Sequence, residues 1–330
     1  MKQYKWCLVG LLFCSAALNY GDRTAISSVF PLLREDLGAS DVQLGAIGTV
    51  FLWAYALASP LAGYVADRVS RSRMIVASLT AWSAVTLATG LVTSMNWLLA
   101  TRVLLGFAEA AYLPAAIALI ADYHASDTRG TAIGLHTAGL SFGMVAGGAG
   151  AGWLGENFGW RVGFFILGVA GLALAVLAYF WPKDRTRATV AEAPPIGRSL
   201  VALLTIPSCV IIMSEAMIVS IGTWIFLNWL PLYFNEAYGM SLAAAGFAGT
   251  FMLQGAATLG VTAGGYVSDR VAWKQPRRRM LMQVICFALS APFLIAFLSR
   301  PDLAVLNASI FFFSLFGRAG RPAQELGATP

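Results

Sequence analysis

The sequence predicts an all-α integral membrane protein built from two parallel six-helix repeats, of which the second is incomplete. Hydrophobic residues make up 58% of the 330 residues and charged residues only 12%, with a mean hydropathy of +0.71, whereas soluble domains carry about 25% charged residues. Apolar runs of about 20 residues, the length that crosses a bilayer as a helix, recur along the chain. The heptapeptide at residues 63–69 returns almost unchanged at 265–271, an offset of 202 residues, which indicates two related halves.

The apolar runs place nine or ten membrane spans along the chain. We expect them at 6–31, 42–66, 74–93, 96–121, 131–154, 162–181, 209–235, 242–267, 279–298 and from 303. Residues 1–181 then form an N-terminal six-helix bundle, the polar, proline-containing stretch 182–204 is a cytoplasmic linker, 205–317 form a partial C-terminal bundle with spans 7–10, and 318–330 are a tail outside the membrane. Six spans separate the two copies of the heptapeptide, so both copies lie on one face and the repeats are parallel.

The distribution of basic residues predicts the orientation. With the N-terminus in the cytoplasm, only Arg34, Arg161 and Arg300 fall on the outer side, against fifteen basic residues on the inner side. These fifteen are Lys2, Lys5, Arg68, Arg71, Arg73, Arg129, Lys183, Arg185, Arg187, Arg198, Arg270, Lys274, Arg277, Arg278 and Arg279. This bias follows the positive-inside rule. It predicts a multi-pass protein of the plasma (inner) membrane, and it explains the net charge of +6 without a nucleic-acid partner.

Nothing in the sequence points to a metal, a cofactor or an enzyme. The four cysteines all fall inside predicted spans without metal-ligand spacing, and we expect them to be small buried apolar residues. Neither histidine has an acidic or cysteine partner in its own span, and no HExxH or GxSxG motif occurs. A membrane-embedded enzyme would need such a constellation at membrane depth.

Several motifs resemble a known family. The pattern Gly63-x-x-x-Asp67-Arg68-x-x-Arg71-x-Arg73 resembles the loop signature of the major facilitator superfamily. Further motifs are similar to its anion:cation symporters, the proton symporters of organic anions such as hexuronates and galactonate. These are Asn19-Tyr20-x-Asp22-Arg23, Trp53-Ala54-Tyr55, Arg102-x-x-x-Gly106-x-x-Glu109 with Pro114, Gly159-Trp160-Arg161-x-x-Phe164, and Trp224-x-Phe226-Leu227-x-Trp229-Leu230-Pro231-x-Tyr233.

Four charged residues lie inside predicted spans of the first half. Asp22 and Arg23 belong to span 1, while Arg102 and Glu109 lie seven residues apart on one face of span 4. Charged groups at membrane depth are expensive and mark functional sites. The guanidinium of arginine binds a carboxylate through two parallel hydrogen bonds. A carboxylate in an apolar environment can take up and release a proton near neutral pH.

The resemblance implies roles for these residues. Arg23 and Arg102 would bind an organic anion, Asp22 and Glu109 would carry protons, and Tyr20 and Tyr55 would donate hydrogen bonds beside them. Asn228 in span 7 is a candidate cavity residue of the second half. The alternative reading is that Asp22 pairs with Arg23 or Arg102 only to hold the fold together.

The repeated loops are candidate gates. In terms of the family, the loop with Gly63, Asp67 and Arg68 pairs across the two halves and stabilises an outward-open state. Asp269 and Arg270 are its counterparts in the second half. Positive-inside charge alone explains the remaining basic residues of these loops.

The sequence thus predicts a monomeric secondary transporter that moves a small organic anion, such as a sugar acid, together with protons by alternating access. One alternative is a lipid or drug exporter of the same superfamily. Another is a truncated product that transports nothing. Adding the 202-residue offset to the start of span 5 at residue 131 places span 11 near residue 333, and apolar character fails at Gly317, so we expect spans 11, 12 and half of span 10 to be missing.

Overall fold

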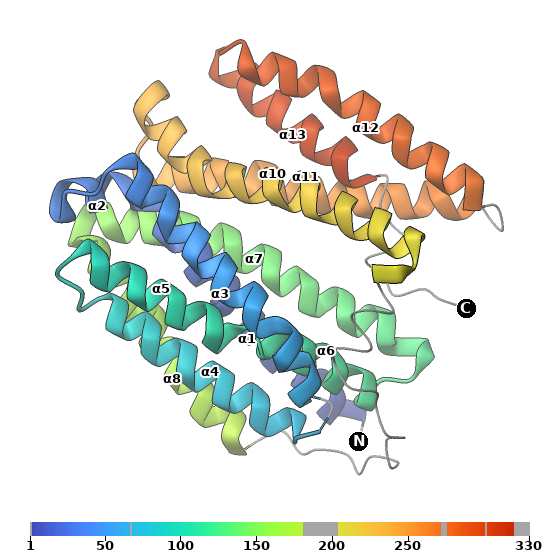
Figure 1. Ribbon diagram of the computed structural model, residues 1–330, viewed down its shortest axis with the longest axis horizontal. Coiled ribbons are helices and arrows are strands. Elements are labelled where there is room, and N and C mark those ends of the chain that lie inside the picture. Colours follow the sequence, from blue (N-terminus) through green and yellow to red (C-terminus); the bar gives the residue numbers. More distant parts are fainter. Residues whose placement is uncertain (1, 67, 181–203, 272–275, 301, 320–330) are drawn as a thin grey trace.

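The computed structural model describes residues 2–66, 68–180, 204–271, 276–300 and 302–319 (Figure 1). Every regular element in these ranges is a helix, which confirms the predicted all-α class. The helices are α1 (Lys2–Ser28), α2 (Phe30–Leu37), α3 (Asp41–Ala66), α4 (Arg71–Thr89), α5 (Met95–Glu109), α6 (Tyr112–Tyr123), α7 (Ser126–Phe158), α8 (Trp160–Phe180), α10 (Pro207–Tyr238), α11 (Leu242–Val271), α12 (Pro276–Leu298) and α13 (Leu303–Ala319).

The helices form two neighbouring groups (Figure 1). In the first bundle, α1–α8, the long helix α1 packs along α7, α4 packs along α8, and α3 packs along α5. In the second group, α10–α13, the helices α12 and α10 flank α13 and α11, which pack on each other. The groups meet mainly where α7 contacts α11 and α1 contacts α10.

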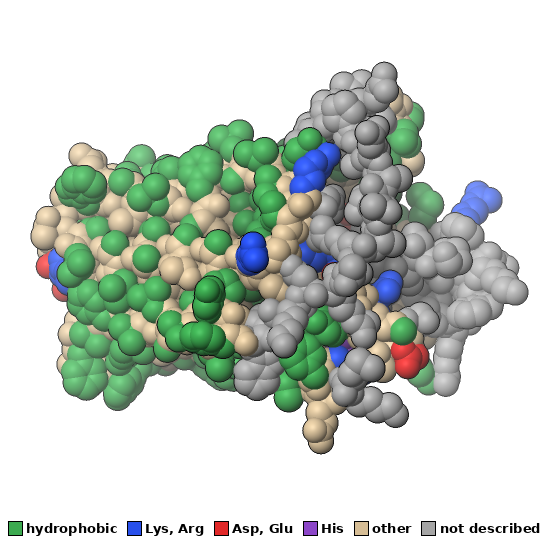
Figure 2. Space-filling view, turned by 90° about the horizontal axis from the view of Figure 1, so that it is seen from below, with side chains coloured by type: hydrophobic (Ala, Val, Ile, Leu, Met, Phe, Trp, Pro, Cys, Tyr) green, Lys and Arg blue, Asp and Glu red, His purple; other side chains and the backbone are tan. Residues whose placement is uncertain are grey.

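The surface of the molecule is suited to a bilayer. Within the described ranges, six helices are long and apolar enough to cross a membrane: Asp41–Ala66, Met95–Tyr123, Trp160–Phe180, Pro207–Tyr238, Leu242–Val267 and Met280–Leu298. Helices α1, α4 and α7 lie along these spans, but their charged, hydroxyl and glycine residues lower their hydropathy. One long face shows mainly hydrophobic and uncharged side chains (Figure 2). Because apolar side chains on this scale would be unfavourable in water, this is a multi-pass membrane protein.

Two predicted spans are interrupted by proline. The expected span 6–31 ends early: α1 stops at Ser28, and α2 begins at Phe30 with Pro31 in its first turn. Proline is accepted there because the N–H groups of the first turn have no acceptor within the helix. The expected span 96–121 breaks between Glu109 and Tyr112, because the Pro114 ring clashes with the carbonyl four residues earlier. The break makes Glu109 the last residue of α5.

Glycine sets the distance between α1 and α7. A Cβ atom on Gly143 would overlap the backbone of Ala17, and one on Gly147 would overlap the backbone of Gly21. The two helices therefore touch backbone to backbone, as small residues at four-residue spacing allow. This contact fixes the depth at which Asp22 and Arg23 of α1 lie in the bundle.

Contacts between the two groups gather at one end of the molecule, which we call the α2 end. Ser27 donates to the carbonyl of Leu227 at 3.2 Å, a group that Pro231 leaves without its intrahelical donor. Arg34 forms an ion pair with Glu236, its counterpart at the 202-residue offset. From the α2 end, α10 and α11 diverge from α7 toward the opposite end (Figure 1).

Several expectations concern residues that the structure describes in part. The expected linker 182–204 and tail 318–330 lie almost wholly outside the described residues, as do Asp67 and the side chains of Asp269 and Arg270. The expectation of four buried cysteines is wrong, because Cys7 and Cys14 are exposed and Cys209 and Cys286 are partly so. A small apolar side chain is stable both in lipid and in the protein interior, so the hydrophobicity of cysteine does not predict whether it is buried.

Candidate functional site

The four charged residues predicted inside the first half meet in its interior as two ion pairs. Asp22 pairs with Arg102 at 3.3 Å, and Arg23 pairs with Glu109 at 2.7 Å. Consecutive residues of a helix point about 100° apart, so the neighbours Asp22 and Arg23 reach different partners. All four side chains are at most 4% exposed. Burial of four formal charges is tolerated because each finds an opposite charge, although desolvation offsets much of the attraction.

The Asp22–Arg102 pair is further held by α4. The hydroxyl of Thr86 donates to Oδ2 of Asp22, and Nη2 of Arg102 donates to the hydroxyl of Thr89 at 2.6 Å. Both oxygens of Asp22 therefore have donors, since Nη1 of Arg102 occupies Oδ1. Hydrogen bonds of this kind stabilise the ionised form of a carboxylate. The pair is a fixed element of the site.

Each pair leaves one buried atom without a partner among the described residues: Nε of Arg102 in the first pair and Oε1 of Glu109 in the second. Nε of Arg23 donates to Oε2 of Glu109 at 2.7 Å, and Nη2 donates to the side-chain oxygen of Asn19 at 3.3 Å. The second oxygen of Glu109, Oε1, is buried, and no described residue donates to it. The ionised form of Glu109 therefore depends on Arg23.

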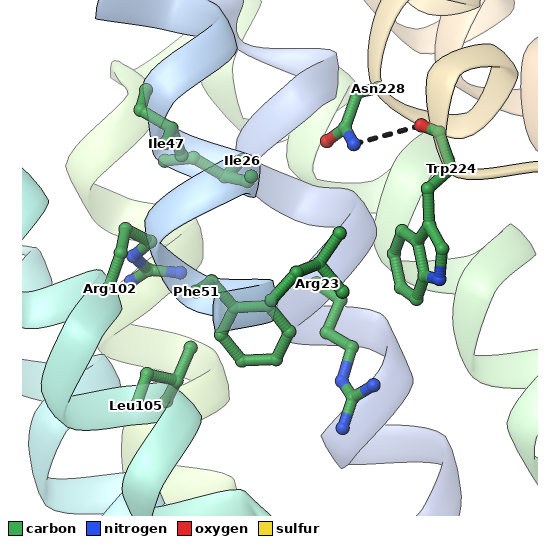
Figure 3. Close-up of a pocket in the computed structure, with 10 residues that line it drawn as sticks. Arg23, Ile26, Ile47, Phe51, Arg102, Leu105, Trp224 and Asn228 are labelled. Atoms are coloured by element: carbon green, nitrogen blue, oxygen red, sulfur yellow. Dashed lines mark hydrogen bonds between the residues drawn. The ribbon is translucent and has the colours of Figure 1, made fainter. Parts of the chain in front are cut away.

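Both arginines line one pocket between the two groups of helices (Figure 3). The free volume of the pocket is about 20 Å³, room for about one water molecule. Its walls come from α1, α3 and α5 on one side and from α10 on the other. The lining residues are Arg23, Ile26, Ile47, Gly48, Phe51, Leu52, Arg102, Leu105, Trp224 and Asn228.

The second half contributes an aromatic ring and an amide to the pocket. Trp224 and Asn228 lie one turn apart on α10, and the amide of Asn228 donates to the carbonyl of Trp224 at 2.9 Å (Figure 3). The side chain of Asn228 reaches across to Gly48 of α3, where a Cβ atom would lie 2.9 Å from its amide nitrogen. The glycine therefore lets α10 approach the first bundle at the pocket.

The structure thus brings together most of the predicted site. The six residues Tyr20, Asp22, Arg23, Tyr55, Arg102 and Glu109 lie in one cluster, with Asn228 across the pocket. Of the candidate gate residues, Gly63 and Arg68 lie apart from it. Gly63 is near the end of α3, and Arg68 donates to the carbonyl of Tyr64 at 3.0 Å and stacks over its ring. The gating role of this loop stays a prediction.

Four residues of the cluster were not predicted as site residues: Asn19, Phe51, Thr86 and Thr89. Asn19 lies four residues before Arg23, and Phe51 lies four residues before Tyr55, so each shares a helix face with a predicted site residue. That spacing was available in the sequence. Thr86 and Thr89 also share a face of α4, but threonines are common in membrane helices, and only the fold shows what they meet.

Among the described residues outside the membrane-spanning segments, Arg34 and His124 have shifted pKa values. The hydrogen bond with Glu236 raises the pKa of Arg34 at the α2 end. Burial lowers the pKa of His124, whose ring lies against Trp6 and within hydrogen-bond distance of the Thr128 hydroxyl and the Lys5 carbonyl. Among the described residues, no group of three or more His, Cys, Asp or Glu is placed to hold a metal ion.

Comparison with known proteins gives three matches that bear on this site. The sequence model of the Major Facilitator Superfamily matches residues 12–321. A probable galactarate/D-glucarate transporter of Bacillus subtilis is 29% identical over 334 residues, covering 92% of this chain and 71% of the relative. A hexuronate transporter of the same organism is 28% identical over 324 residues, covering 93% of this chain and 76% of the relative.

A solved structure supports the fold. The crystal structure of a bacterial homologue of the human lysosomal transporter Spinster, in an inward-facing and unoccupied conformation, superimposes with a TM-score of 0.75 at 24% identity. The match covers 98% of this chain and 75% of that structure. At this level of identity, the likeness concerns the arrangement of the helices.

Proposed function

Because this chain belongs to the Major Facilitator Superfamily, we propose that it moves a small organic anion, such as a sugar acid, across the membrane together with protons. The observation that carries this proposal is the pair of buried arginines, Arg23 and Arg102, on one pocket. Each has one carboxylate partner. A planar guanidinium is the side chain best suited to a carboxylate ligand.

The charges of the cluster supply a coupling mechanism. With Asp22 and Glu109 ionised, the two arginines and two acids sum to zero. A proton on Glu109 leaves the cluster with one net positive charge, which attracts an anion in a low-dielectric setting. A monocarboxylate then restores neutrality. One proton per monoanion therefore keeps the loaded site uncharged. With a dianion, the loaded site carries one net negative charge unless a second proton is bound.

The two acids take different roles in this proposal. Glu109 carries the proton, because its Oε1 has no donor among the described residues and can hold the hydrogen without breaking a contact. Asp22 is the fixed counter-charge of Arg102, because Thr86 and Arg102 use both of its oxygens. Protonation of Asp22 would disrupt that arrangement.

The substrate class follows from the pocket and from the relatives. The relatives are described as transporters of galactarate, D-glucarate and hexuronate, which combine carboxylates with hydroxyl groups. The pocket pairs the arginines of the first bundle with Trp224 and Asn228 on α10. Arg23 and Arg102 would bind the carboxylate, with Tyr20 and Tyr55 beside them, while Asn228 would bond a hydroxyl group.

The membrane orientation belongs to the same proposal. Arg68, Arg71 and Arg129 lie at the end of the first bundle that also holds the N-terminus. By the positive-inside rule this end faces the cytoplasm of the plasma (inner) membrane, and the α2 end faces outward. The repeated loops with Gly63, Asp67, Arg68, Asp269 and Arg270 then lie on the cytoplasmic side, where they would gate the pocket. The transporter would act as a monomer.

Uptake into proteoliposomes tests the proposal. Purified protein is reconstituted, and uptake of radiolabelled D-glucarate, D-glucuronate and galactonate is measured with and without an acid-outside pH gradient. We expect gradient-driven accumulation of at least one acid that a protonophore abolishes. Arg102→Lys should reduce uptake by at least about tenfold, because an ammonium cannot make the bidentate contact. Equal uptake with and without protein would refute the proposal.

A lipid or drug exporter of the same fold is the second candidate. Six of the pocket residues are apolar or aromatic: Ile26, Ile47, Phe51, Leu52, Leu105 and Trp224. Efflux of a fluorescent cationic dye or a lysolipid from the same proteoliposomes would favour this candidate. Competition by the sugar acids against such efflux would favour the first.

A further inference from the structure

We propose that Phe51 is a positioning residue that, with Tyr20 and Tyr55, holds the Arg23 guanidinium in place when Glu109 gives up its negative charge. The three rings enclose one cation: the central carbon of the guanidinium lies 4.4 Å from the ring centre of Tyr20, 4.8 Å from that of Tyr55 and 4.9 Å from that of Phe51. We call this group the aromatic cage. The proposal rests on the proposed function, because it concerns the same coupling site.

The cage answers a physical problem that proton coupling creates. While Glu109 is ionised, its carboxylate compensates the buried charge of Arg23 at 2.7 Å. Once Glu109 is protonated on Oε1, Arg23 is a cation 4% exposed that keeps hydrogen bonds to Oε2 of Glu109 and to the side-chain oxygen of Asn19 but has lost its carboxylate counter-charge. An uncompensated buried charge is strongly unfavourable. Without another source of attraction, the flexible side chain would leave the position from which it meets the anion.

Aromatic faces supply that attraction without neutralising the charge. A ring within about 6 Å of a guanidinium attracts it through the ring quadrupole, most strongly where water is excluded. The rings carry no formal charge, so Arg23 remains available to an incoming carboxylate. A second acid in the same place would hold Arg23 equally well, but it would also compete with the substrate.

Comparison with Arg102 supports this assignment. Arg102 keeps its carboxylate partner Asp22 and its hydroxyl partner Thr89. Its aromatic neighbour Phe164 is more distant, with the ring centre 5.6 Å from the central carbon of the guanidinium. The cage therefore surrounds the arginine whose counter-charge is expected to change and not the one whose counter-charge is fixed.

Phe51 is the member of the cage that isolates this role. It lines the pocket next to Arg23 (Figure 3) and is 5% exposed. Unlike the tyrosines, it has no hydroxyl group, so its replacement removes a π face and no hydrogen bond. Phe51→Leu removes that face and keeps an apolar side chain, and Phe51→Tyr keeps the face. Phe234 is a matched control, because it is fully buried and its ring packs on Tyr233 and Tyr238.

A double-mutant cycle tests the proposal without any substrate. Thermal unfolding in detergent is measured for Phe51→Leu and Phe234→Leu, each alone and combined with Glu109→Gln, which imitates the protonated acid. We expect Phe51→Leu to lower Tm by about 2–4 °C more in the Glu109→Gln background than alone. Phe234→Leu should lower Tm equally in both backgrounds. Equal effects of Phe51→Leu in the two backgrounds would overturn the positioning role.

Transport kinetics give a second readout. With D-glucarate or D-glucuronate as the probe, Phe51→Leu should raise KM about tenfold with a maximal rate within about twofold of wild type, and Phe51→Tyr should restore the wild-type KM. A change in maximal rate alone, or failure of Phe51→Tyr to restore KM, would contradict the proposal. If wild-type protein takes up no acid, the proposed function fails, and the thermal cycle still decides whether the cage holds Arg23.

Discussion

Replacement of Glu109 by glutamine separates proton coupling from substrate binding. The glutamine side chain has the same shape, so its carbonyl oxygen can still accept from Nε of Arg23, where Glu109 accepts at 2.7 Å. Its amide nitrogen takes the position of Oε1, which has no donor among the described residues. The substitution therefore removes one negative charge and one proton site while it disturbs few contacts.

The expected loss of stability follows from the burial of the pair. The Arg23 and Glu109 side chains are 4% and 0% exposed, and removal of one partner from such a pair costs about 3–5 kcal/mol. The retained neutral hydrogen bond returns about 1 kcal/mol. We expect the free energy of unfolding to fall by about 2–4 kcal/mol. The exposed Glu35 on α2 provides the matched control, since Glu35→Gln should change it by less than about 0.5 kcal/mol.

The transport assay gives the decisive result. For electroneutral symport with one proton, a pH difference of one unit sustains about tenfold accumulation of a monoanion. Glu109→Gln should abolish that accumulation, while exchange of labelled for unlabelled sugar acid across the membrane continues. Gradient-driven accumulation that persists unchanged in Glu109→Gln, together with an unchanged Glu35→Gln control, would refute the role of Glu109 as proton carrier.

Three further predictions concern packing, the α2 end and pH. Gly143→Ala should sharply reduce the yield of folded protein in size-exclusion chromatography in detergent, because the new Cβ overlaps the α1 backbone. Gly134→Ala is the control and should keep the yield, because a Cβ there has open space around it; equal yields for the two variants would contradict the packing argument. Arg34 pairs with both Glu236 and Asp41 at partly exposed positions, so Arg34→Glu should lower stability by about 1 kcal/mol. Adding Glu236→Arg should restore part of the loss, because Asp41 still lies opposite the new acid; a double variant no more stable than Arg34→Glu would contradict the pairing of Arg34 with Glu236. Burial lowers the pKa of His124 below its ordinary value of 6.5, so this group binds fewer protons in the folded state than in the unfolded state. The free energy of unfolding should therefore keep its full value above about pH 6.5 and fall by at most about 1.4 kcal/mol per pH unit below it. His124→Gln should reduce that loss when Tm is measured as a function of pH.

The class of fold was accessible from the sequence because a bilayer imposes a simple rule on composition. In lipid, every backbone N–H and C=O of a single segment must be hydrogen-bonded within its own helix. Long apolar runs are therefore helices, and their positions along the sequence locate the spans. The predicted ranges fail where proline acts locally. Breaks occur near Pro31 and Pro114, whereas Pro60, Pro231 and Pro292 lie inside continuous helices. A proline in the sequence therefore does not by itself show where a helix breaks.

The candidate site was partly accessible for the same reason. Charges in apolar runs are conspicuous, and the seven-residue spacing of Arg102 and Glu109 places them on one face of a helix. Which acid meets which arginine could not be derived, because it depends on how α1 sits against α4 and α5. Glycine at positions such as 143 and 147 sets that depth by backbone contact.

The sequence by itself determined the class of protein, the duplication at an offset of 202 residues and the set of buried charges. All three follow from one-dimensional properties: hydropathy, repetition and spacing along a helix. The tertiary structure alone decided the pairing of Asp22 with Arg102 and of Arg23 with Glu109. It also decided the enclosure of Arg23 by three rings. The physical reason is that a helix face offers several partners within reach, and only the packing of neighbouring helices brings one of them within contact distance.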